Sequence, residues 1–535
     1  MPPWEKGDLP DAPAWRWRDW TYLIGPGLLG AGAAIGGGEW LMGPVNTGRY
    51  GGAVLWVTTL SIIAQVVYNI EISRYTLYTG EPIMNGKFRT FLGPMLWLGV
   101  YLLLDVGSFL PYQIASAATP VFAVIAGRMP DPASDRALLI FLMCAVFVIA
   151  ALPLAFAGKI YSFIKGVMAV KVVVVFGSLS LLALLYSSAQ TWMEILTGFF
   201  RFGTVPVRSG GTENLFASIL SGRGLPDVDP SSVAALAAFA AIAGIGGLKN
   251  TMISSYTRDQ GWGMGAQVGA ISSRFGGRDI QLSHAGRIFL VTARALPRWR
   301  RWMRHVAREQ IAVWMTGSLV GVALPAMLSV RFLPRGEQGD PWKMAALTAE
   351  SIQREVGGAL GLAWWYLLMT CALLVLVPNT ISDADSTVRR WVDLAWSASG
   401  RLRKWDPLRI NRFYFWALVS FVALGVATLL FLPRPRGLVE IYGCIANYAL
   451  GFSCLHVLAV NLTLLPGELR PRWFSRIGLA LSGIYFFALS AVTLAAEIRR
   501  GNEALGATAL AAMVALLALQ AFYFCRCPAD RRPVG

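Results

Sequence analysis

The stretch AGAAIGGGEWLMGP (residues 31–44) is apolar enough to lie in a membrane, yet it holds three consecutive glycines and the carboxylate of Glu39. Glycine costs about 1 kcal/mol per residue in a helix interior, so a helix is weakened here. The stretch AGIGGLKNTM (243–252) repeats the pattern, and Lys249 follows its glycines. Aligning Ile35-Gly36-Gly37-Gly38-Glu39 with Ile245-Gly246-Gly247-Leu248-Lys249 superimposes the two charged residues. The sequence therefore predicts two interrupted helices. A packing seam of small residues explains the glycines alone but not the adjacent charges.

Composition indicates the class of protein. Of the 535 residues, 55% are hydrophobic and 14% charged, and long uncharged runs recur. A membrane span needs about 20 apolar residues. We expect an all-α membrane protein with about twelve spans, near 21–46, 51–79, 93–125, 137–157, 160–186, 231–257, 308–331, 358–380, 411–432, 437–466, 475–497 and 504–525.

The distribution of Lys and Arg predicts the orientation. The loop 258–308 carries ten arginines, and 389–412 carries seven basic residues. Because basic residues favour the cytoplasmic side, the net charge of +17 indicates cytoplasmic N- and C-termini in a plasma membrane, bacterial inner membrane included. These loops can also meet anionic lipid. Their arginines flank spans, which argues against nucleic-acid binding. Residues 1–20 are expected to form a cytoplasmic arm, and 187–230 an external loop.

Interrupted helices suggest a function. Non-helical backbone at membrane depth persists only where protein or water covers its polar groups. Corresponding interruptions in two halves point to the binding site of a transporter built from an inverted repeat. We expect repeats at 21–186 and 231–466, followed by two extra helices and a tail at 467–535.

A family resemblance supports this interpretation. GPGLLGAGAAIGGGEW (25–40), followed by GRYGGAVLWV (48–57), resembles the opening of the Nramp family of divalent-metal transporters, and SRYTLYTGEPI (73–83) is similar to the end of its second span. GIGGLKNT (244–251) stands where Nramp proteins carry Met-Pro-His. The resemblance implies the LeuT-type fold, with five-plus-five inverted repeats, discontinuous helices 1 and 6, and alternating access.

The metal-ligand positions of the family are changed. The Asp, Pro, Gly and Asn positions of the first break hold Gly36, Gly37, Gly38 and Glu39. In the second break, Leu248 replaces the Met. Without a thioether, a hard ion such as Mg²⁺ or Mn²⁺ is favoured over softer metals. Glu39 is the predicted metal ligand, and backbone carbonyls of the glycine-rich breaks assist it.

Lys249 introduces a second possibility. The repeat alignment suggests an ion pair between Glu39 and Lys249, because removing either partner would strand the other charge. Such a pair can recognise a zwitterion, take the place of a bound sodium or metal ion, or lock the two helices together. Alternatively, Lys249 extends its ammonium group to the membrane surface. The predicted solute-contacting residues are Gly36, Gly37, Glu39, Ile245, Gly246, Gly247, Leu248, Lys249, Asn250 and, by analogy, Asn447.

Other charges within spans are functional candidates. Asp105 lies near an acidic position of the Nramp proton route, but Tyr112 and Ala115 follow where further acids are expected. Lys171 resembles the lysine that some LeuT-fold carriers use in place of sodium. Glu71 and Arg74 are spaced to pair on one helical face.

The sequence thus favours a secondary transporter of a divalent cation. A carrier of amino acids or other small organic solutes and a non-transporting sensor or scaffold with a locked site are the alternatives. Neither P-loop nor H-E-x-x-H motif occurs, so we expect no enzyme activity and no cofactor. The six cysteines form no metal-finger or disulfide framework, and His284, His305 and His456 no ligand cluster.

Overall fold

The computed structural model describes residues 1–14, 25–36, 38–131, 133–156, 159–275, 279–336, 341–431 and 435–499, together with positions 514, 515 and 518. Within these residues, nine helices are long and apolar enough to cross a membrane, and they coincide with predicted spans three to eleven. The segments Pro26–Val54 and Trp56–Thr79, the predicted first and second spans, meet at an angle of 93°. Predicted span twelve falls almost wholly outside the described residues. Cys525 and Cys527 also lie outside them.

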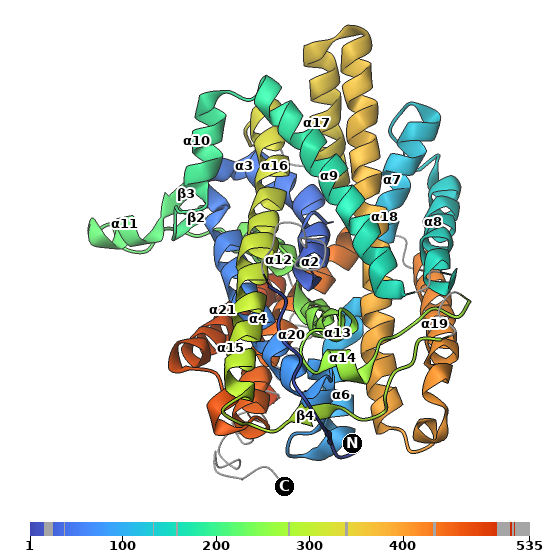
Figure 1. Cartoon of the computed structure of the whole chain (residues 1–535). Coiled ribbons are helices and arrows are strands. Elements are labelled where there is room, and N and C mark those ends of the chain that lie inside the picture. Colours follow the sequence, from blue (N-terminus) through green and yellow to red (C-terminus); the bar gives the residue numbers. More distant parts are fainter. Residues whose placement is uncertain are drawn as a thin grey trace.

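The first half of the bundle and the external segment follow in chain order (Figure 1). The helices are α2 (Pro26–Ala34), α3 (Gly43–Tyr50), α4 (Trp56–Thr79), α5 (Ile83–Phe88), α6 (Gly93–Asp105), α7 (Tyr112–Ala126), α8 (Arg136–Phe156), α9 (Ile160–Tyr186), α10 (Ala189–Gly198) and α11 (Leu215–Leu220). Strands β2 (Thr204–Pro206) and β3 (Thr212–Asn214) pair antiparallel within the predicted external loop.

The second half begins with the other interrupted helix. Its helices are α12 (Pro230–Ile242), α13 (Met252–Asp259), α14 (Gly265–Val268), α15 (Ala295–Glu309), α16 (Thr316–Phe332), α17 (Pro341–Val356), α18 (Gly358–Ala398), α19 (Ile410–Phe431), α20 (Pro435–Thr463) and α21 (Trp473–Arg499). Shorter π- or 3₁₀-helical turns are Gly38–Met42 (η2), Gly51–Val54, Val106–Phe109, Gly247–Thr251 (η5), Gln310–Met315, Leu402–Lys404, Pro407–Arg409 and Gly467–Leu469.

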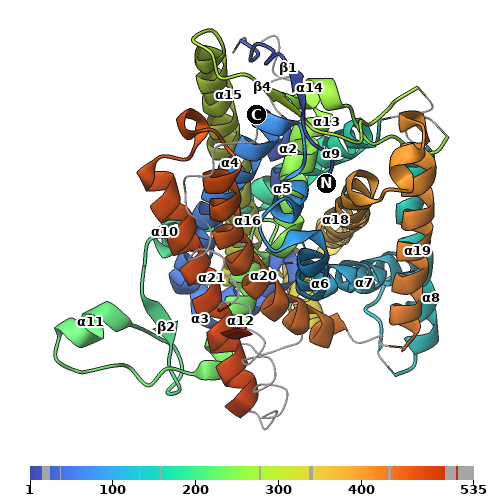
Figure 2. The same cartoon turned by 90° about the horizontal axis from the view of Figure 1, so that it is seen from below.

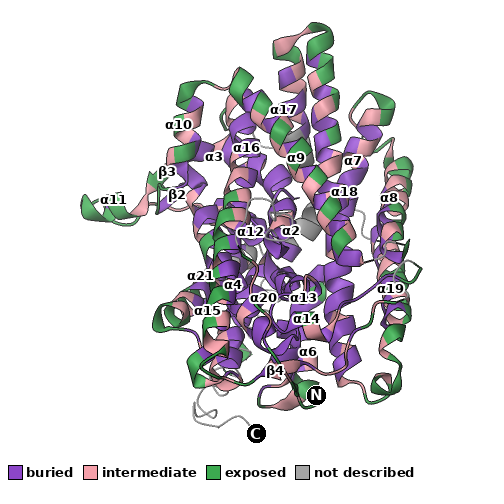
Figure 3. Cartoon of the chain, in the orientation of Figure 1, coloured by how far each residue is buried: buried purple, intermediate pink, exposed green. Residues whose placement is uncertain are grey.

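The interrupted helices lie inside the bundle. In the segment Ser232–Asp259, 89% of the most apolar 18-residue stretch is buried inside the protein. In Arg136–Phe156 the buried share of the corresponding stretch is 28%. Figures 1 and 2 place α2, α12 and α13 between the other helices, with α8 and α19 side by side at one edge. Exposed residues concentrate on outer helices such as α8 and α19 (Figure 3). The central helices are thus enclosed by protein, the condition under which irregular backbone is tolerated at membrane depth.

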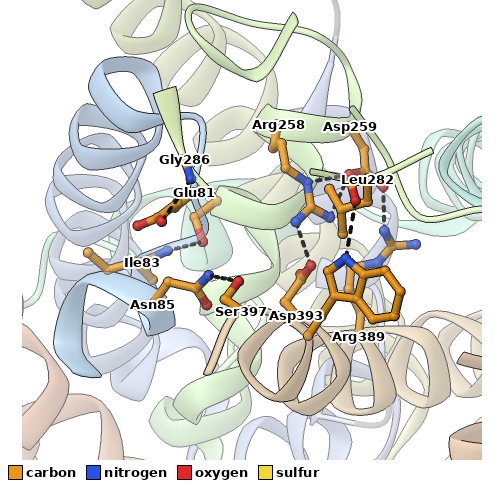
Figure 4. Close-up of polar contacts among 12 residues, drawn as sticks. Glu81, Ile83, Asn85, Arg258, Asp259, Leu282, Gly286, Arg389, Asp393 and Ser397 are labelled. Atoms are coloured by element: carbon orange, nitrogen blue, oxygen red, sulfur yellow. Dashed lines mark hydrogen bonds and ion pairs between the residues drawn. The ribbon is translucent and has the colours of Figure 1, made fainter. Parts of the chain in front are cut away.

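The N-terminal arm is attached to the body of the protein. Strand β1 (Glu5–Gly7) pairs in parallel with β4 (Arg287–Phe289), which lies in the predicted basic loop 258–308. Close by, the buried carboxylate of Glu81 accepts hydrogen bonds from Tyr75 Oη (2.7 Å), Trp4 Nε1 (3.1 Å) and the Gly286 amide (3.1 Å), and it pairs with Arg89. Glu81 therefore joins the arm, α4, the end of α5 and the loop at one point. Figure 4 shows its contact with Gly286 of the loop.

Replacement of Glu81 should weaken this junction in a pH-dependent way. Burial alone would raise the pKa of the Glu81 carboxyl, but Arg89 and the other donors hold the pKa below its ordinary value of 4.5. Its contribution is therefore complete above pH 4.5 and is lost as the pH falls through the folded-state pKa. We expect Glu81→Gln to lower the free energy of unfolding by about 3 kcal/mol at pH 7, because Arg89 is stranded.

The test of this prediction is the melting temperature of the purified protein in detergent between neutral and acid pH. The difference between wild type and Glu81→Gln should shrink as the pH is lowered. Glu5→Gln is the matched control, because the Glu5–Arg287 pair is exposed and such pairs contribute at most about 1 kcal/mol. A difference that is constant with pH would contradict the assigned role.

A second buried polar cluster joins α13 to α18. Arg389 donates to both oxygens of Asp385 (3.0 and 2.9 Å) and pairs with Asp259. Arg258 pairs with Asp259 (2.8 Å) and with Asp393 (2.5 Å). We call these five residues the Arg389 cluster. Figure 4 shows all of them except Asp385, which is not drawn. The predicted basic loop 389–412 is wrong at its start, because α18 continues to Ala398 and buries Arg389 among carboxylates.

Candidate functional site

The first helix break is organised by Glu39. Helix α2 ends at Ala34, and the π-helical turn η2 begins at Gly38. The buried Glu39 carboxylate turns back and accepts the amide of Gly36 at 3.0 Å through Oε2. The side chain thus satisfies a backbone donor that the interruption removes from the helical pattern, as the backbone of any buried segment requires.

The same carboxylate reaches the second break. Helix α12 ends at Ile242, and the 3₁₀-helical turn η5 begins at Gly247. The amide of Gly244 donates to Glu39 Oε1 at 2.9 Å. Gly244 (φ +88°) and Gly246 (φ +75°) adopt backbone conformations that side chains disfavour, which explains the glycines. Glu39 therefore bridges both interruptions, 205 residues apart in sequence.

Lys171 of α9 supports the first break from the opposite side. Its buried ammonium group donates to the carbonyl oxygens of Ile35 (2.6 Å) and Val375 (3.1 Å) and to Asn379 Oδ1 (2.5 Å). Asn379 Nδ2 in turn donates to the Ala33 carbonyl at 3.0 Å. These three oxygens and Asn379 make Lys171 the link from the first break to α9 and α18.

Gln65 is a site residue that sequence reasoning missed. From α4, its Oε1 accepts the amides of Ile245 and Gly246 (both 3.3 Å) and Asn250 Nδ2 (3.0 Å), and its Nε2 donates to the Ala243 carbonyl (2.7 Å). One side chain thus satisfies the donors and an acceptor of the second break. A lone glutamine in the apolar run SIIAQVVY (61–68) was the available signal.

Lys249 meets a different carboxylate from the one predicted. Its Nζ lies 2.6 Å from Asp383 Oδ2, and Gln113 Nε2 donates to the same oxygen at 2.7 Å. The proposed pair of Lys249 with Glu39 is therefore wrong. Asp383 stands on α18, three residues past the predicted end of span eight, so the sequence interpretation placed it outside the membrane helix.

These groups surround a small cavity, which we call the site cavity. Its volume is about 10 Å³, close to that of one water-sized probe. It is lined by Ala33, Gly36, Glu39, Gln113, Ile242, Gly244, Ile245, Met252, Asn379 and Asp383. A second cavity of about 20 Å³, the adjoining cavity, shares Gln113 and Asp383 with it and includes Lys249.

The electrostatic composition of the region is balanced. The carboxylates of Glu39 and Asp383 are accompanied by the ammonium groups of Lys171 and Lys249, so the formal charges cancel. Among the residues that the structure describes, no group of three or more His, Cys, Asp or Glu side chains is arranged to hold a metal ion. Any metal bound here would therefore rely on two carboxylates, on amide and backbone oxygens, on the thioether of Met252 and on its own water.

Several predicted solute-contacting residues lie elsewhere. Leu248 packs in an apolar cluster with Trp97, Tyr101 and Phe452, and Asn447 Nδ2 donates to the Ala237 carbonyl at 3.0 Å. Gly247 and Asn250 belong to the second break but do not line the site cavity, and Gly246 lies beside it. Gly37 is outside the described residues.

The remaining buried charges hold helices together away from the site cavity. Asp105 accepts two hydrogen bonds from Arg390 (2.9 Å each) and one from Trp391 (2.8 Å), which links α6 to α18. Glu71 pairs with Arg74 at 2.7 Å, and Asn461 of α20 donates to Glu71 at 3.2 Å.

Comparison with known proteins gives the fold. No family model and no curated protein match the chain. It is similar in structure to a manganese transporter from Eremococcus coleocola, which was solved in complex with an aromatic bis-isothiourea substituted compound. The two sequences are 13% identical, the match covers 97% of this chain and 98% of that chain, and the TM-score is 0.63. Mhp1, a nucleobase-cation-symport-1 family transporter in a closed conformation, matches at 12% identity, with 95% of each chain covered and a TM-score of 0.50.

At such identities the likeness establishes the architecture. The LeuT-like fold that the Nramp resemblance implied is confirmed, and the chain is a mostly helical integral membrane protein. The inverted repeat and alternating access stay predictions.

Proposed function

We propose that the protein is a secondary transporter that moves a small hard cation, a divalent ion such as Mg²⁺ or Mn²⁺, by alternating access. The observation that carries this proposal is the lining of the site cavity, where two carboxylates and two amide side chains meet backbone from both helix breaks. The carboxylate and amide oxygens of this lining suit Mg²⁺, Ca²⁺ and Mn²⁺. The thioether of Met252 also lines the cavity, and it accepts a hydrogen bond from Ser382 at 3.9 Å. Glu39 and Asp383 are the proposed charged ligands.

The size of the cavity supports an ion over an organic solute. About 10 Å³ accommodates one water-sized particle, whereas an amino acid requires the surrounding helices to separate. A zwitterion would also need a cation for its carboxylate, and Lys249 lines the adjoining cavity instead of the site cavity. A carrier of amino acids therefore ranks second.

The mechanism follows from the two interruptions. Helices α2, α12 and α13 meet at Glu39, so they can move together as the unit that opens the site to either side. Lys171 and Asn379 connect this unit to α9 and α18. In the proposed orientation the N-terminal arm faces the cytoplasm, and α15, with its Trp299 and Trp302 buried and its arginines outward, lies near anionic lipid.

The test uses the full chain in liposomes that contain a Mn²⁺-quenched dye. We expect saturable Mn²⁺ influx that Mg²⁺ inhibits and a panel of amino acids does not. Glu39→Gln should slow influx at least about tenfold, because hydrogen bonds to a charged group contribute roughly 1.5–3 kcal/mol each. Glu213→Gln, at an exposed position of β3, should leave influx unchanged.

Each outcome separates one interpretation from the others. Saturable uptake of an amino acid without Mn²⁺ influx would favour the organic-solute carrier. Absence of saturable flux for every solute would favour the non-transporting alternative, in which the Lys249–Asp383 pair locks the site. Normal Mn²⁺ influx in Glu39→Gln would remove Glu39 from the ligand set.

A further inference from the structure

We infer that Asp383 is a cation ligand of the transport site and that Lys249 is a tethered substitute for the transported cation, which occupies Asp383 whenever the site is empty. This inference rests on the proposed function and specifies how the same site is regulated. It predicts that the empty carrier returns across the membrane without a coupled ion.

The position of Asp383 carries the first step. Its carboxylate lines both the site cavity, which contains Glu39, and the adjoining cavity, which contains Lys249. The Lys249 ammonium group approaches Asp383 Oδ2 to 2.6 Å, and Gln113 donates to the same oxygen. An ammonium group and a metal cation seek the same carboxylate oxygens, so they compete for this place.

The exposure of the two partners differs, and the difference decides which of them meets a solute. The Asp383 side chain is 24% exposed, whereas that of Lys249 is 3% exposed. In the other acid–base pairs of α18 both side chains are buried. Those of Arg390 and Asp105, for example, are 1% and 0% exposed. A cation that enters the site cavity therefore reaches the carboxylate of Asp383 while the lysine remains behind it.

Lys249 contacts an aromatic ring at the same time as Asp383. Its Nζ lies 4.7 Å from the centroid of the Tyr442 ring, within the range of a cation–π interaction. A lysine has a flexible four-carbon stem, so its ammonium group can keep this ring contact when a cation takes its place on Asp383. Asp105 is occupied by Arg390 and Trp391 and is not an alternative partner of that kind.

The pair solves an electrostatic problem of alternating access. With a divalent cation bound, Glu39 and Asp383 balance the charge of the cargo, while Lys171 stays among its three oxygens and Lys249 stays on the Tyr442 ring. Without it, an unpaired buried carboxylate would make closure of the empty site costly. Lys249 restores the neutral pair on Asp383, so the empty carrier can reorient. The Lys171 ammonium is already held by three neutral oxygens and is not needed for this step.

Two transport modes separate this role from a structural one. Net influx into metal-free liposomes requires return of the empty carrier, whereas exchange of external radioactive Mn²⁺ for internal Mn²⁺ does not. We expect Lys249→Gln to reduce net influx at least about tenfold, because it leaves Asp383 without its charge partner in the empty state. The rate of Mn²⁺ exchange should stay within about threefold of the wild-type rate, which corresponds to a change in activation free energy of under about 1 kcal/mol.

Control variants define the charge requirement. Lys249→Arg, which keeps the charge, should restore net influx, and Lys404→Gln, at an exposed position, should change neither mode. Asp383→Asn should reduce both modes. Equal loss of net influx and exchange in Lys249→Gln, or full retention of net influx, would overturn the inference. Absence of Mn²⁺ flux in the wild type would instead overturn the proposed function.

A second variant covers the case in which Lys249→Gln does not fold. Tyr442→Leu leaves the ion pair in place but removes the ring contact that would stabilise Lys249 after a cation takes its place on Asp383. Mn²⁺ then displaces the lysine less easily, so its affinity, measured by titration of the purified protein, should fall about threefold or more, as expected for a cation–π contact. Unchanged or increased Mn²⁺ affinity would contradict competition between the two cations.

Discussion

Replacing Arg389 with methionine is expected to lower the free energy of unfolding by about 3–5 kcal/mol, the largest stability effect that we predict for this protein. Arg389 is fully buried and is the shared partner of Asp385 and Asp259. Asp385 also accepts hydrogen bonds from Tyr256 Oη (2.9 Å) and Tyr414 Oη (2.6 Å). Methionine fills much of the volume but leaves Asp385 without its cation, and Asp259 must then rely on Arg258, which it shares with Asp393.

The measurement is unfolding of the purified protein in mixed micelles, with the melting temperature as a second readout. Arg354→Met is the matched control, because the Arg354 side chain is 71% exposed and its pair with Glu350 spans 3.5 Å. Such a surface pair contributes about 0.3–0.5 kcal/mol. If the two variants lost similar stability, the Arg389 cluster would not be the connection between α13 and α18 that its geometry indicates.

Replacing Gly246 with alanine is expected to reduce transport at least about a hundredfold, because a strained backbone and a steric clash together cost about 3 kcal/mol or more at the second helix break. Gly246 has a φ of +75°, and an added Cβ would lie 2.1 Å from the carbonyl oxygen of Ala241. That contact is to backbone, so relief requires α12 to move relative to Gly244 and hence to Glu39.

Gly177→Ala is the control for this prediction. Gly177 lies in helix α9, and an added Cβ meets no atom within 4 Å, so alanine should be tolerated and add up to about 1 kcal/mol of stability. The test is Mn²⁺ influx together with the melting temperature of both variants. Wild-type influx in Gly246→Ala would show that the second break does not have to keep this conformation.

The helices that cross the membrane were predictable because their signal is local. Runs of apolar residues gave spans three to eleven in their correct places, and the glycine runs identified both interruptions. A break requires residues that leave the helix, and glycine is needed at a position such as Gly246, where φ is +75°.

The partners of buried charges were not predictable in the same way. Predicted span eight ends at residue 380, because the run ISDADSTVRR (381–390) that follows holds more charges than a lipid-facing helix tolerates. In the structure it is part of α18 and faces protein. Arg389 is neutralised by Asp259 of α13 and by Asp385 of the run itself. Nothing within the run itself indicates the distant segment that makes this burial possible.

The error over Lys249 has a related cause. Aligning the two breaks places Glu39 and Lys249 at equivalent positions along their segments, but it does not give the direction of a side chain around the helix axis. Turn η5 is 3₁₀-helical whereas η2 is π-helical, so the two residues leave their axes differently. Glu39 reaches the amide of Gly244, and Lys249 reaches Asp383 on α18.

The sequence by itself determined the class of protein, the spans and the presence of two glycine-rich breaks with charged residues, because hydrophobicity and glycine conformation act over a few neighbouring residues. Only the tertiary structure decided that Glu39 bridges both breaks, that Gln65 and Lys171 satisfy their backbone groups, and that Asp383 is the partner of Lys249. These contacts join residues far apart in the chain, and a buried charge takes whichever opposite charge or polar group the packing brings within reach.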